Sequence, residues 1–341
     1  MTYQVSDTLH LWCLTDPSTP VYIGELHTAR SMRGVSLRYA PEWRACGFAL
    51  SEDLPLIDEE FLPAQRDSAP GAIDDARPDR WGERVIRFID RPPRLSLMEF
   101  LYFAGDERFG ALGVSTSAQH YLPRDIGPLP QWGDVAVLHG LTQRVLSGEP
   151  VSDAERRMLT PGVTMGGARP KALVQIDGHP WVLKFSEPGE DIDMPLVEHA
   201  CMTLAARAGI EVAPTLPIPL PTGGHAVAVR RFDREPGRRL HGQSAGCALQ
   251  ACGDEPGYPE LAAWLRRRGV SAEGLHLRQQ HELFRRMVFN LLIDNTDDHE
   301  KNHALLTRDG RQWWLSPAFD VLPSGQALGY QQMRVGQAGA D

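Results

Sequence analysis

The pattern of apolar and polar positions predicts strands in the first third of the chain. Residues 21–26 and 35–39 alternate apolar and polar side chains, the period of a half-buried strand. Residues 81–88 instead carry apolar side chains at helical intervals. These patterns predict a small N-terminal α+β domain over residues 1–125.

A connector is predicted after this domain. Prolines at 123, 128 and 130 interrupt regular structure, and residues 134–146 then repeat apolar side chains at helical spacing. We therefore predict a helical connector over residues 126–155 and a new unit from about residue 156.

A glycine-containing loop precedes a predicted β-hairpin in this unit. Residues 160–171 contain Gly166 and Gly167, and two strand-like runs, 172–176 and 181–185, flank the turn pair Asp177-Gly178. Glycines allow backbone N–H groups to approach phosphate oxygens closely. The loop matches neither common nucleotide-binding glycine motif, and many glycine clusters only turn the chain, so the loop alone is weak evidence.

Two charged residues near the hairpin strengthen the nucleotide interpretation. Lys184 lies in an otherwise apolar strand, where an unpaired ammonium would be costly to bury. Glu198 lies on a helix predicted from capping residues Asp191 and Asp193 to Gly209, with its apolar face at Leu196, Val197, Ala200, Cys201, Leu204 and Ala208. A strand lysine paired with a helix glutamate directs an ammonium at nucleotide phosphates in kinases. The alternative is a surface lysine and a solvated glutamate.

Further strands around Gly223-Gly224 complete a predicted nucleotide-binding lobe over residues 156–240. A mainly helical catalytic lobe is predicted over residues 241–341. Its helix, within residues 271–295, carries apolar residues that we expect in the core: Leu283, Met287, Phe289, Leu291 and Leu292.

The segment after this helix contains the residues that we predict to be catalytic. Asp297 precedes Asn302 by five residues, and Asp320 follows an aromatic residue, the spacing of the catalytic base and magnesium ligands in protein kinases. The order glycine loop, strand lysine, helix glutamate, Asp-x4-Asn and aromatic-Asp fits a single mechanism.

Residues 299–303 also fit H-E-x-x-H, the zinc-protease signature. A zinc site needs both histidines on one helical face and a third ligand. Residues 304–315 instead look like strand, turn and strand, and the sequence after His303 contains no further histidine, glutamate or cysteine. Phosphoryl transfer is therefore the favoured interpretation.

The amino-acid composition argues against several classes of protein but does not point to a reaction. The chain has 341 residues, 42% hydrophobic and 23% charged, with a formal net charge of -9. This acidic balance argues against a broad basic surface for nucleic acid. Five scattered cysteines indicate no disulfide framework, and no apolar run reaches the roughly 18 residues of a membrane span, so a cytoplasmic protein is expected.

Several motifs in order resemble the HipA family. They are residues 166–171, 184–186, 231–234, 295–302 and 316–320, and, in the first domain, residues 21–26, 78–82 and 109–112. Nearly the whole chain is covered. The resemblance implies a protein-kinase-like two-lobed catalytic core with an N-terminal α+β domain, overall an α+β fold.

The resemblance also implies a function. Family members are serine/threonine protein kinases that act as toxins of toxin–antitoxin pairs, with ATP and Mg²⁺ as cofactors, a small helix-turn-helix antitoxin as partner and DNA contacted only through it. Protein substrates in the family include aminoacyl-tRNA synthetases. No membrane role is implied.

Residue roles follow from the same resemblance. Asp297 would accept the substrate hydroxyl proton, Asn302 and Asp320 would hold magnesium, and Thr164 would be the autophosphorylation site. The nucleotide-binding residues implied are Gly166, Gly167, Lys171, Lys184, Glu198 and Phe232.

One departure leaves alternatives open. Family members usually continue with further helices after the aromatic-Asp motif, so a shortened catalytic lobe is expected here. A nucleotide-binding pseudokinase that mainly binds an antitoxin for DNA repression is therefore the second hypothesis. A small-molecule phosphotransferase is the third, because such enzymes share the Asp-x4-Asn logic.

Overall fold

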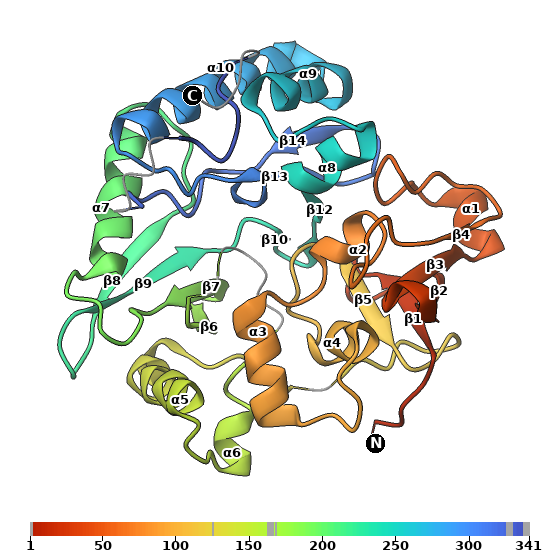
Figure 1. Cartoon of the computed structure of the whole chain (residues 1–341), viewed down its shortest axis with the longest axis horizontal. Helices are drawn as coiled ribbons and strands as arrows, with labels where there is room; N and C mark the ends of the chain where they lie inside the picture. Colours follow the sequence, from red (N-terminus) through yellow and green to blue (C-terminus); the bar gives the residue numbers. More distant parts are fainter. Residues whose placement is uncertain (1–2, 125, 162–166, 168, 325–329, 337–341) are drawn as a thin grey trace.

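The computed structural model describes residues 3–124, 126–161, 167, 169–324 and 330–336. In Figure 1 the N-terminal domain lies on the right, the sheet formed by residues 171–230 on the left, and the helices of residues 245–292 along the top. The candidate catalytic residues come from two of these regions: Lys184 from the sheet on the left, and Asp297, Asn302 and Asp320 from the segment that follows the helices at the top.

The N-terminal domain is built on an antiparallel sheet with strand order β4-β3-β2-β1-β5. The strands are β1 (Thr8–Cys13), β2 (Val21–Ala29), β3 (Gly34–Tyr39), β4 (Glu60–Phe61) and β5 (Leu112–Ser115). The helices are a 3-10 turn (Arg30–Met32), α1 (Pro41–Cys46), α2 (Ala72–Asp75), α3 (Arg80–Val85), a π-helix (Ile86–Asp90) and α4 (Leu97–Phe103). The strands predicted at 21–26 and 35–39 and the helix predicted at 81–88 are confirmed.

Alternation of side chains explains how this sheet is covered. Leu9 and Leu11 of β1 and Ile23 of β2 are at most 1% exposed and belong to one apolar cluster with Leu101 of α4. Helix α4 packs against β3 and β5. Its N-terminus is stabilised by a capping box between Ser96 and Glu99.

The middle of the chain forms a second antiparallel sheet, with strand order β6-β7-β9-β8. Its strands are β6 (Lys171–Ile176), β7 (His179–Lys184), β8 (Thr215–Pro219) and β9 (His225–Arg230). The associated helices are a 3-10 turn (Trp132–Asp134), α5 (Val135–Ser147), α6 (Asp153–Arg156) and α7 (Met194–Arg207). The predicted connector helix and hairpin strands are confirmed.

Two helices cover the two faces of this sheet. Ala226 and Ala228 of β9 cluster with residues of α5, whereas Val227 and Val229 cluster with Met202 of α7. Successive side chains of a strand point to opposite faces, so this division follows from the period of two. The hairpin turn consists of Asp177 and Gly178, both with positive φ, as a tight two-residue turn requires.

The predicted apolar face of α7 is wrong. Leu196 is 38% and Leu204 51% exposed, whereas Glu198 and Met202 are buried. The helix begins as predicted, because the side chain of Asp193 accepts a hydrogen bond from the backbone N–H of Leu196 at 3.3 Å. The face of α7 that is buried differs from the prediction because Glu198 points into the core, where it accepts a hydrogen bond from Lys184.

The C-terminal part combines a small antiparallel sheet, in the order β12-β13-β14, with three helices in the described ranges. Its elements are β12 (His241–Ser244), α8 (Ala245–Cys252), α9 (Tyr258–Arg268), a 3-10 turn (Ala272–Gly274), α10 (Leu275–Leu292), a 3-10 turn (Glu300–Asn302), β13 (Ala304–Thr307) and β14 (Trp313–Leu315). A short hairpin of β10 (Arg234–Glu235) and β11 (Arg238–Arg239) joins it to the middle sheet. Throughout the described segments, every helix is too short or too polar to cross a bilayer.

The expectation for α10 is only partly confirmed. Leu283 and Phe289 are buried, but Leu291 is 43% and Leu292 80% exposed. The last turn of this helix turns its leucines outward, because its opposite face packs against α9 and β14.

The strand, turn and strand predicted at 304–315 are confirmed as β13 and β14. Residues 300–302 form only a 3-10 turn, and β13 starts immediately after His303. His303 lies with its Nε2 atom 3.2 Å from an oxygen of Asp298. The two histidines of the H-E-x-x-H match therefore do not share the helical face that the zinc signature needs.

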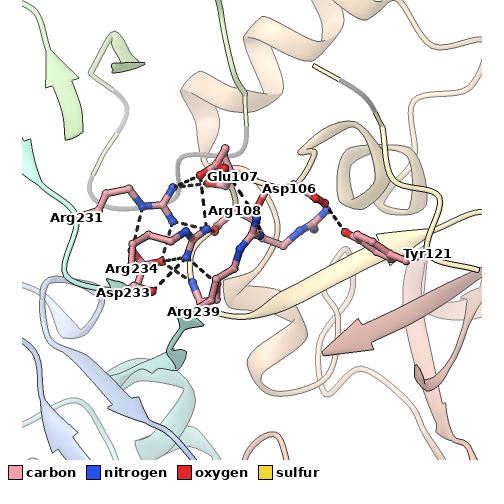
Figure 2. A network of polar contacts seen from close by, with 9 residues as sticks. Asp106, Glu107, Arg108, Tyr121, Arg231, Asp233, Arg234 and Arg239 are labelled. Atoms are coloured by element: carbon pink, nitrogen blue, oxygen red, sulfur yellow. Dashed lines mark hydrogen bonds and ion pairs between the residues drawn. The ribbon is translucent and has the colours of Figure 1, made fainter. Parts of the chain in front are cut away.

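A buried network of charged side chains joins the N-terminal domain to the rest of the chain (Figure 2). Arg231 donates to both oxygens of Asp233 at 2.9 and 2.7 Å and to the backbone oxygen of Glu107 at 2.8 Å. Asp233 also accepts from the backbone N–H of Gly110 at 2.8 Å, and Arg234 donates to the oxygen of Gly110 at 2.9 Å. The motif at 231–234 thus fixes the loop before β5 onto the catalytic part.

His241 makes a second buried contact between the two parts, and it predicts a loss of stability in acid. Its Nε2 atom lies 2.8 Å from the carbonyl oxygen of Leu50, and its Nδ1 atom is buried without a partner among the described residues. Burial lowers the pKa of His241 from 6.5 to about 4. Between these values the unfolded chain binds a proton that the folded chain excludes, so stability falls as the pH falls from 6.5 to 4, by up to about 3 kcal/mol.

Urea unfolding of the wild type and His241→Gln at several pH values between 7 and 4.5 measures this loss. The glutamine can keep a hydrogen bond to Leu50 but does not titrate, so the variant should lose less stability on acidification. His120→Gln, which changes an exposed histidine, serves as the control and should follow the wild type. Parallel curves for wild type and His241→Gln would disprove the assignment.

Candidate active site

Lys184, Glu198 and Asp320 meet in one buried cluster. The Nζ atom of Lys184, the last residue of β7, donates to Glu198 Oε1 and to Asp320 Oδ1, both at 2.6 Å. Lys184 is 4% and Glu198 2% exposed. The sequence separates Lys184 and Asp320 by 136 positions, so this contact joins the two predicted lobes.

The charges of this cluster depend on one another. Burial alone would lower the pKa of Lys184, but the carboxylates of Asp320 and Glu198 raise it above its ordinary value. Burial raises the pKa of Glu198, and the Lys184 ammonium opposes that rise. Burial would also raise the pKa of Asp320, yet Lys184 brings it below its ordinary value. Lys184 and Asp320 therefore form a charged pair at neutral pH.

Buried polar contacts with α9 and α10 hold the loop that carries Asp297 in place. Tyr258 of α9 donates to Asp298, and Asn290 of α10 donates to the Tyr258 hydroxyl at 3.2 Å. Asn295 in turn donates to Asn290 at 3.2 Å. These residues are buried, whereas Asp297 itself is exposed, so a fixed backbone presents its carboxylate at the surface.

Among the described residues, Gln332 is the side-chain partner of Asp297. Gln332, in the segment after the aromatic-Asp motif, donates from Nε2 to Asp297 Oδ1 at 2.8 Å. The Gln332 amide thus occupies one oxygen of the carboxylate that the sequence predicts to be the base. The segment is fixed nearby, because Met333 is fully buried and Arg334 donates to Glu260 at 2.6 Å.

The predicted magnesium ligands offer suitable oxygen atoms. Asn302 Oδ1 is buried and has no hydrogen-bond partner among the described residues, while its Nδ2 donates to the backbone oxygen of Asp297 at 3.4 Å. His, Cys, Asp and Glu side chains in the described segments form no group of three or more that could hold a metal. A kinase magnesium site needs fewer protein ligands, because phosphate oxygens and waters complete the shell. The residues present thus fit Mg²⁺.

A cavity of about 640 Å³ opens beside Asp297. The N-terminal domain and the catalytic part line it together. Its lining residues are Asp74, Asp75, Arg77, Pro78, Asp79, Arg80, Glu83, Phe109, Gly167, Ser244, Asp297, His299, Lys301, Ala304, Phe319 and Gln332. Such a volume lies within the range of ligand pockets.

Lys171 lies at the edge between these two parts. Its ammonium bonds to Asp79 and to the backbone oxygen of Gly167, the latter at 2.7 Å. Lys171 is 1% exposed, and burial raises the pKa of Asp79 in spite of the lysine. In this structure Lys171 makes an interdomain ion pair, and its contact with a nucleotide stays a prediction.

Phe232 is placed away from the cavity. Its ring centroid lies 5.2 Å from that of Phe319 and 6.2 Å from that of Phe109. The cavity's lining includes both of these neighbours but not Phe232. Its predicted nucleotide contact is not tested by this geometry. Gly166 and the autophosphorylation candidate Thr164 lie outside the described residues.

Sequence reasoning missed three groups at the cavity. Asp75 accepts from the backbone N–H of Ser244 at 2.6 Å and from its hydroxyl at 2.9 Å. Asp79 pairs with Lys171, and Gln332 with Asp297. A motif at residues 78–82 had marked the region of Asp79, but neither periodicity nor spacing singles out Asp75 or Gln332.

Comparisons with known proteins cover both parts of the chain. Residues 163–341 match the model of the HipA-like C-terminal domain, and residues 19–115 match the HipA N-terminal domain. A curated relative, "Putative kinase Y4dM" of Sinorhizobium fredii, is 33% identical over 162 residues. That alignment spans 42% of this chain and 37% of the relative, little more than a third of its length.

Solved structures show the fold. HipA of Shewanella oneidensis MR-1, determined in a complex with HipB and operator DNA, superposes with a TM-score of 0.63 at 17% identity. The superposition covers 98% of this chain and 80% of that one, and it confirms the predicted protein-kinase-like α+β fold. The proinflammatory kinase CtkA of Helicobacter pylori gives a TM-score of 0.36 at 19% identity, over 46% of this chain and 54% of its own, which is too low to support an argument.

The family model for the C-terminal domain alone matches more than half of the sequence, and the motifs at residues 166–171, 231–234, 295–302 and 316–320 lie within it. The chain therefore belongs to the HipA family.

Proposed function

We propose that this chain is an ATP-dependent serine/threonine protein kinase that acts as the toxin of a toxin–antitoxin pair. The observation that carries the proposal is the contact of Lys184 with both Glu198 and Asp320. In kinases a lysine–helix glutamate ion pair aims the ammonium at the phosphates, and the aromatic-Asp carboxylate next to it holds magnesium.

The reaction would use the residues in distinct roles. Asp297 accepts the proton of a serine or threonine hydroxyl while the hydroxyl oxygen bonds to the γ-phosphorus. The bond from that phosphorus to the bridging oxygen breaks, and ADP leaves with the electron pair. Lys184 contributes positive charge next to the phosphates. Asn302 and Asp320 would hold Mg²⁺, which neutralises phosphate charge when bound.

Mg²⁺ dependence tests this assignment. Asn302→Ala removes a ligand oxygen and should raise the Mg²⁺ concentration for half-maximal transfer by about tenfold or more. Asn302→Asp keeps an oxygen at the same place and should remain close to the wild type at saturating Mg²⁺. The measurement is phosphate incorporation from labelled ATP into the protein itself and into added proteins, mapped by mass spectrometry.

Two outcomes would contradict different parts of this proposal. Transfer that persists in EDTA would remove Asn302 and Asp320 from the mechanism. Tight ATP binding by calorimetry without transfer to any protein would favour the second hypothesis, a nucleotide-binding pseudokinase that binds an antitoxin.

We also propose a small helix-turn-helix antitoxin as the partner, with DNA bound only through it. The support is the related HipA, which was solved with HipB and operator DNA, together with the net charge of -9 of this chain. A protein such as an aminoacyl-tRNA synthetase is the proposed substrate. Co-purification with the product of the adjacent reading frame, followed by a DNA shift assay of each protein alone and together, tests the partner.

A further inference from the structure

The cavity beside Asp297 is lined by carboxylates and by two cations, Arg80 and Lys301, that form no salt bridge in the described segments. Its N-terminal-domain carboxylates are all bonded to protein groups: Asp74 lies 3.4 Å from Arg77, Asp75 bonds to Ser244, Asp79 to Lys171, and Glu83 lies 3.0 Å from Arg87. Asp74, Asp79 and Glu83 are thus paired with cations, whereas Asp75 is bonded to the neutral Ser244 and is attracted electrostatically by Lys301.

Two cationic side chains that line the same cavity have no such bonded partner among the described residues. Arg80 and Lys301 are exposed, and in the described part of the chain their side chains make no hydrogen bond or ion pair. They come from opposite sides, Arg80 from α3 of the N-terminal domain and Lys301 from the loop of Asp297. Arg80 and Lys301 thus place two cations without a salt bridge in the cavity that Asp297 also lines.

The backbone that carries Arg80 is fixed, although its side chain is free. The neighbouring Asp79 caps α3 by accepting from Gly82 N at 2.8 Å, and Trp81 Nε1 donates to the backbone oxygen of Lys171 at 2.7 Å. A Cβ atom on Gly82 would lie 2.1 Å from the oxygen of Pro161, so α3 is in close contact with the start of the nucleotide-binding lobe. A free cation on a rigid support is suited to binding an anion with little ordering cost.

The cavity reaches from Gly167 of the glycine loop to Asp297 but does not include the buried lysine cluster. Lys184, Glu198 and Asp320 are absent from its lining, and Lys184 is 4% exposed. Asp297, which would receive the acceptor's proton, does line it. An anion bound between Arg80 and Lys301 therefore lies near the hydroxyl that is phosphorylated.

We propose that Arg80 and Lys301 bind a carboxylate of the substrate protein, so that the preferred acceptor is a serine or threonine with an aspartate or glutamate close to it in the sequence. Arginine suits this role, because its planar guanidinium binds a carboxylate through two hydrogen bonds. The inference rests on the proposed kinase activity and makes the N-terminal domain part of substrate recognition.

Three peptides that differ only in the residues flanking one serine test this proposal. The flanks are aspartate, asparagine or lysine. The wild type should prefer the acidic peptide. Arg80→Ala should raise KM for that peptide about tenfold or more, because both charge-assisted hydrogen bonds of the guanidinium are lost, and leave KM for ATP unchanged. Arg80→Glu should reverse the order of preference, a result that a merely structural role would not produce.

Arg66→Glu makes the same change of charge at an exposed arginine of the same domain, outside the cavity, and should keep the wild-type preference. Equal rates for the three peptides in the wild type would overturn the inference. A raised KM for ATP in Arg80→Ala, with peptide preference unchanged, would assign the cation to the nucleotide and also overturn it.

Failure of the kinase proposal remains distinguishable. Absence of transfer from the wild type to any acceptor would reject the proposed kinase activity. It would leave the proposed binding of an acidic peptide in the cavity open to a separate test. Fluorescence anisotropy of the labelled acidic and lysine peptides then decides, because binding needs no transfer. Tighter binding of the acidic peptide, lost in Arg80→Glu, supports the inference, and equal binding rejects it.

Discussion

Asp297→Asn lowers the rate of phosphoryl transfer by about 10³-fold, the usual contribution of a general base. The asparagine keeps an oxygen that can accept the hydrogen bond of Gln332, which now reaches Asp297 at 2.8 Å. It cannot take up the proton of an acceptor hydroxyl at neutral pH. The buried support of the loop, through Asp298 and Tyr258, is untouched, so the fold and ATP binding should be retained.

The measurement is kcat for phosphate incorporation at saturating ATP, together with thermal unfolding of both proteins. Asp294→Asn is the matched control. Asp294 is exposed in the same loop and has positive φ, which asparagine tolerates, so the variant makes the same charge change without touching the base. Full activity in Asp297→Asn, or equal loss in both variants, would remove Asp297 from the mechanism.

Asp233→Ala destabilises the folded protein by about 3–5 kcal/mol, the range for breaking a buried ion pair by removing one partner. Asp233 is fully buried and accepts from Arg231, Arg234 and the backbone of Gly110 (Figure 2). Burial alone would raise the pKa of Asp233, but the two guanidinium groups hold it well below its ordinary value. Removal of this carboxylate leaves two buried cations with like charge next to each other.

Urea unfolding at pH 7 measures the change in the free energy of unfolding. Asp67→Asn is the control, because Asp67 and its partner Arg33 are both more than half exposed and asparagine tolerates the positive φ of Asp67, so this variant should unfold close to the wild type. Since the folded pKa of Asp233 is depressed, its stabilisation is present above the ordinary carboxylate pKa and is lost only as the pH falls below it. A wild-type free energy in Asp233→Ala would show that the interdomain network does not hold the two parts together.

Much of the fold could be predicted because its signals are local. The hairpin turn at Asp177-Gly178 follows from two residues and the alternation beside them, and the start of α7 follows from the capping side chain of Asp193. The spacing of Asp297 and Asn302 is likewise a short-range pattern. Such features depend on backbone conformation over a few residues, which neighbouring side chains largely determine.

The sequence by itself therefore determined the hairpins, most helix positions and the identity of the groups proposed for catalysis. Only the tertiary structure decided which face of α7 is buried, since Glu198 turns inward to reach Lys184. It also decided that Lys171 pairs with Asp79, 92 positions away, and that Gln332 reaches Asp297 across 35 positions. Periodicity carries no information about such partners, because ion pairs and hydrogen bonds between distant segments depend on how the domains pack and on the cost of leaving a buried charge unpaired.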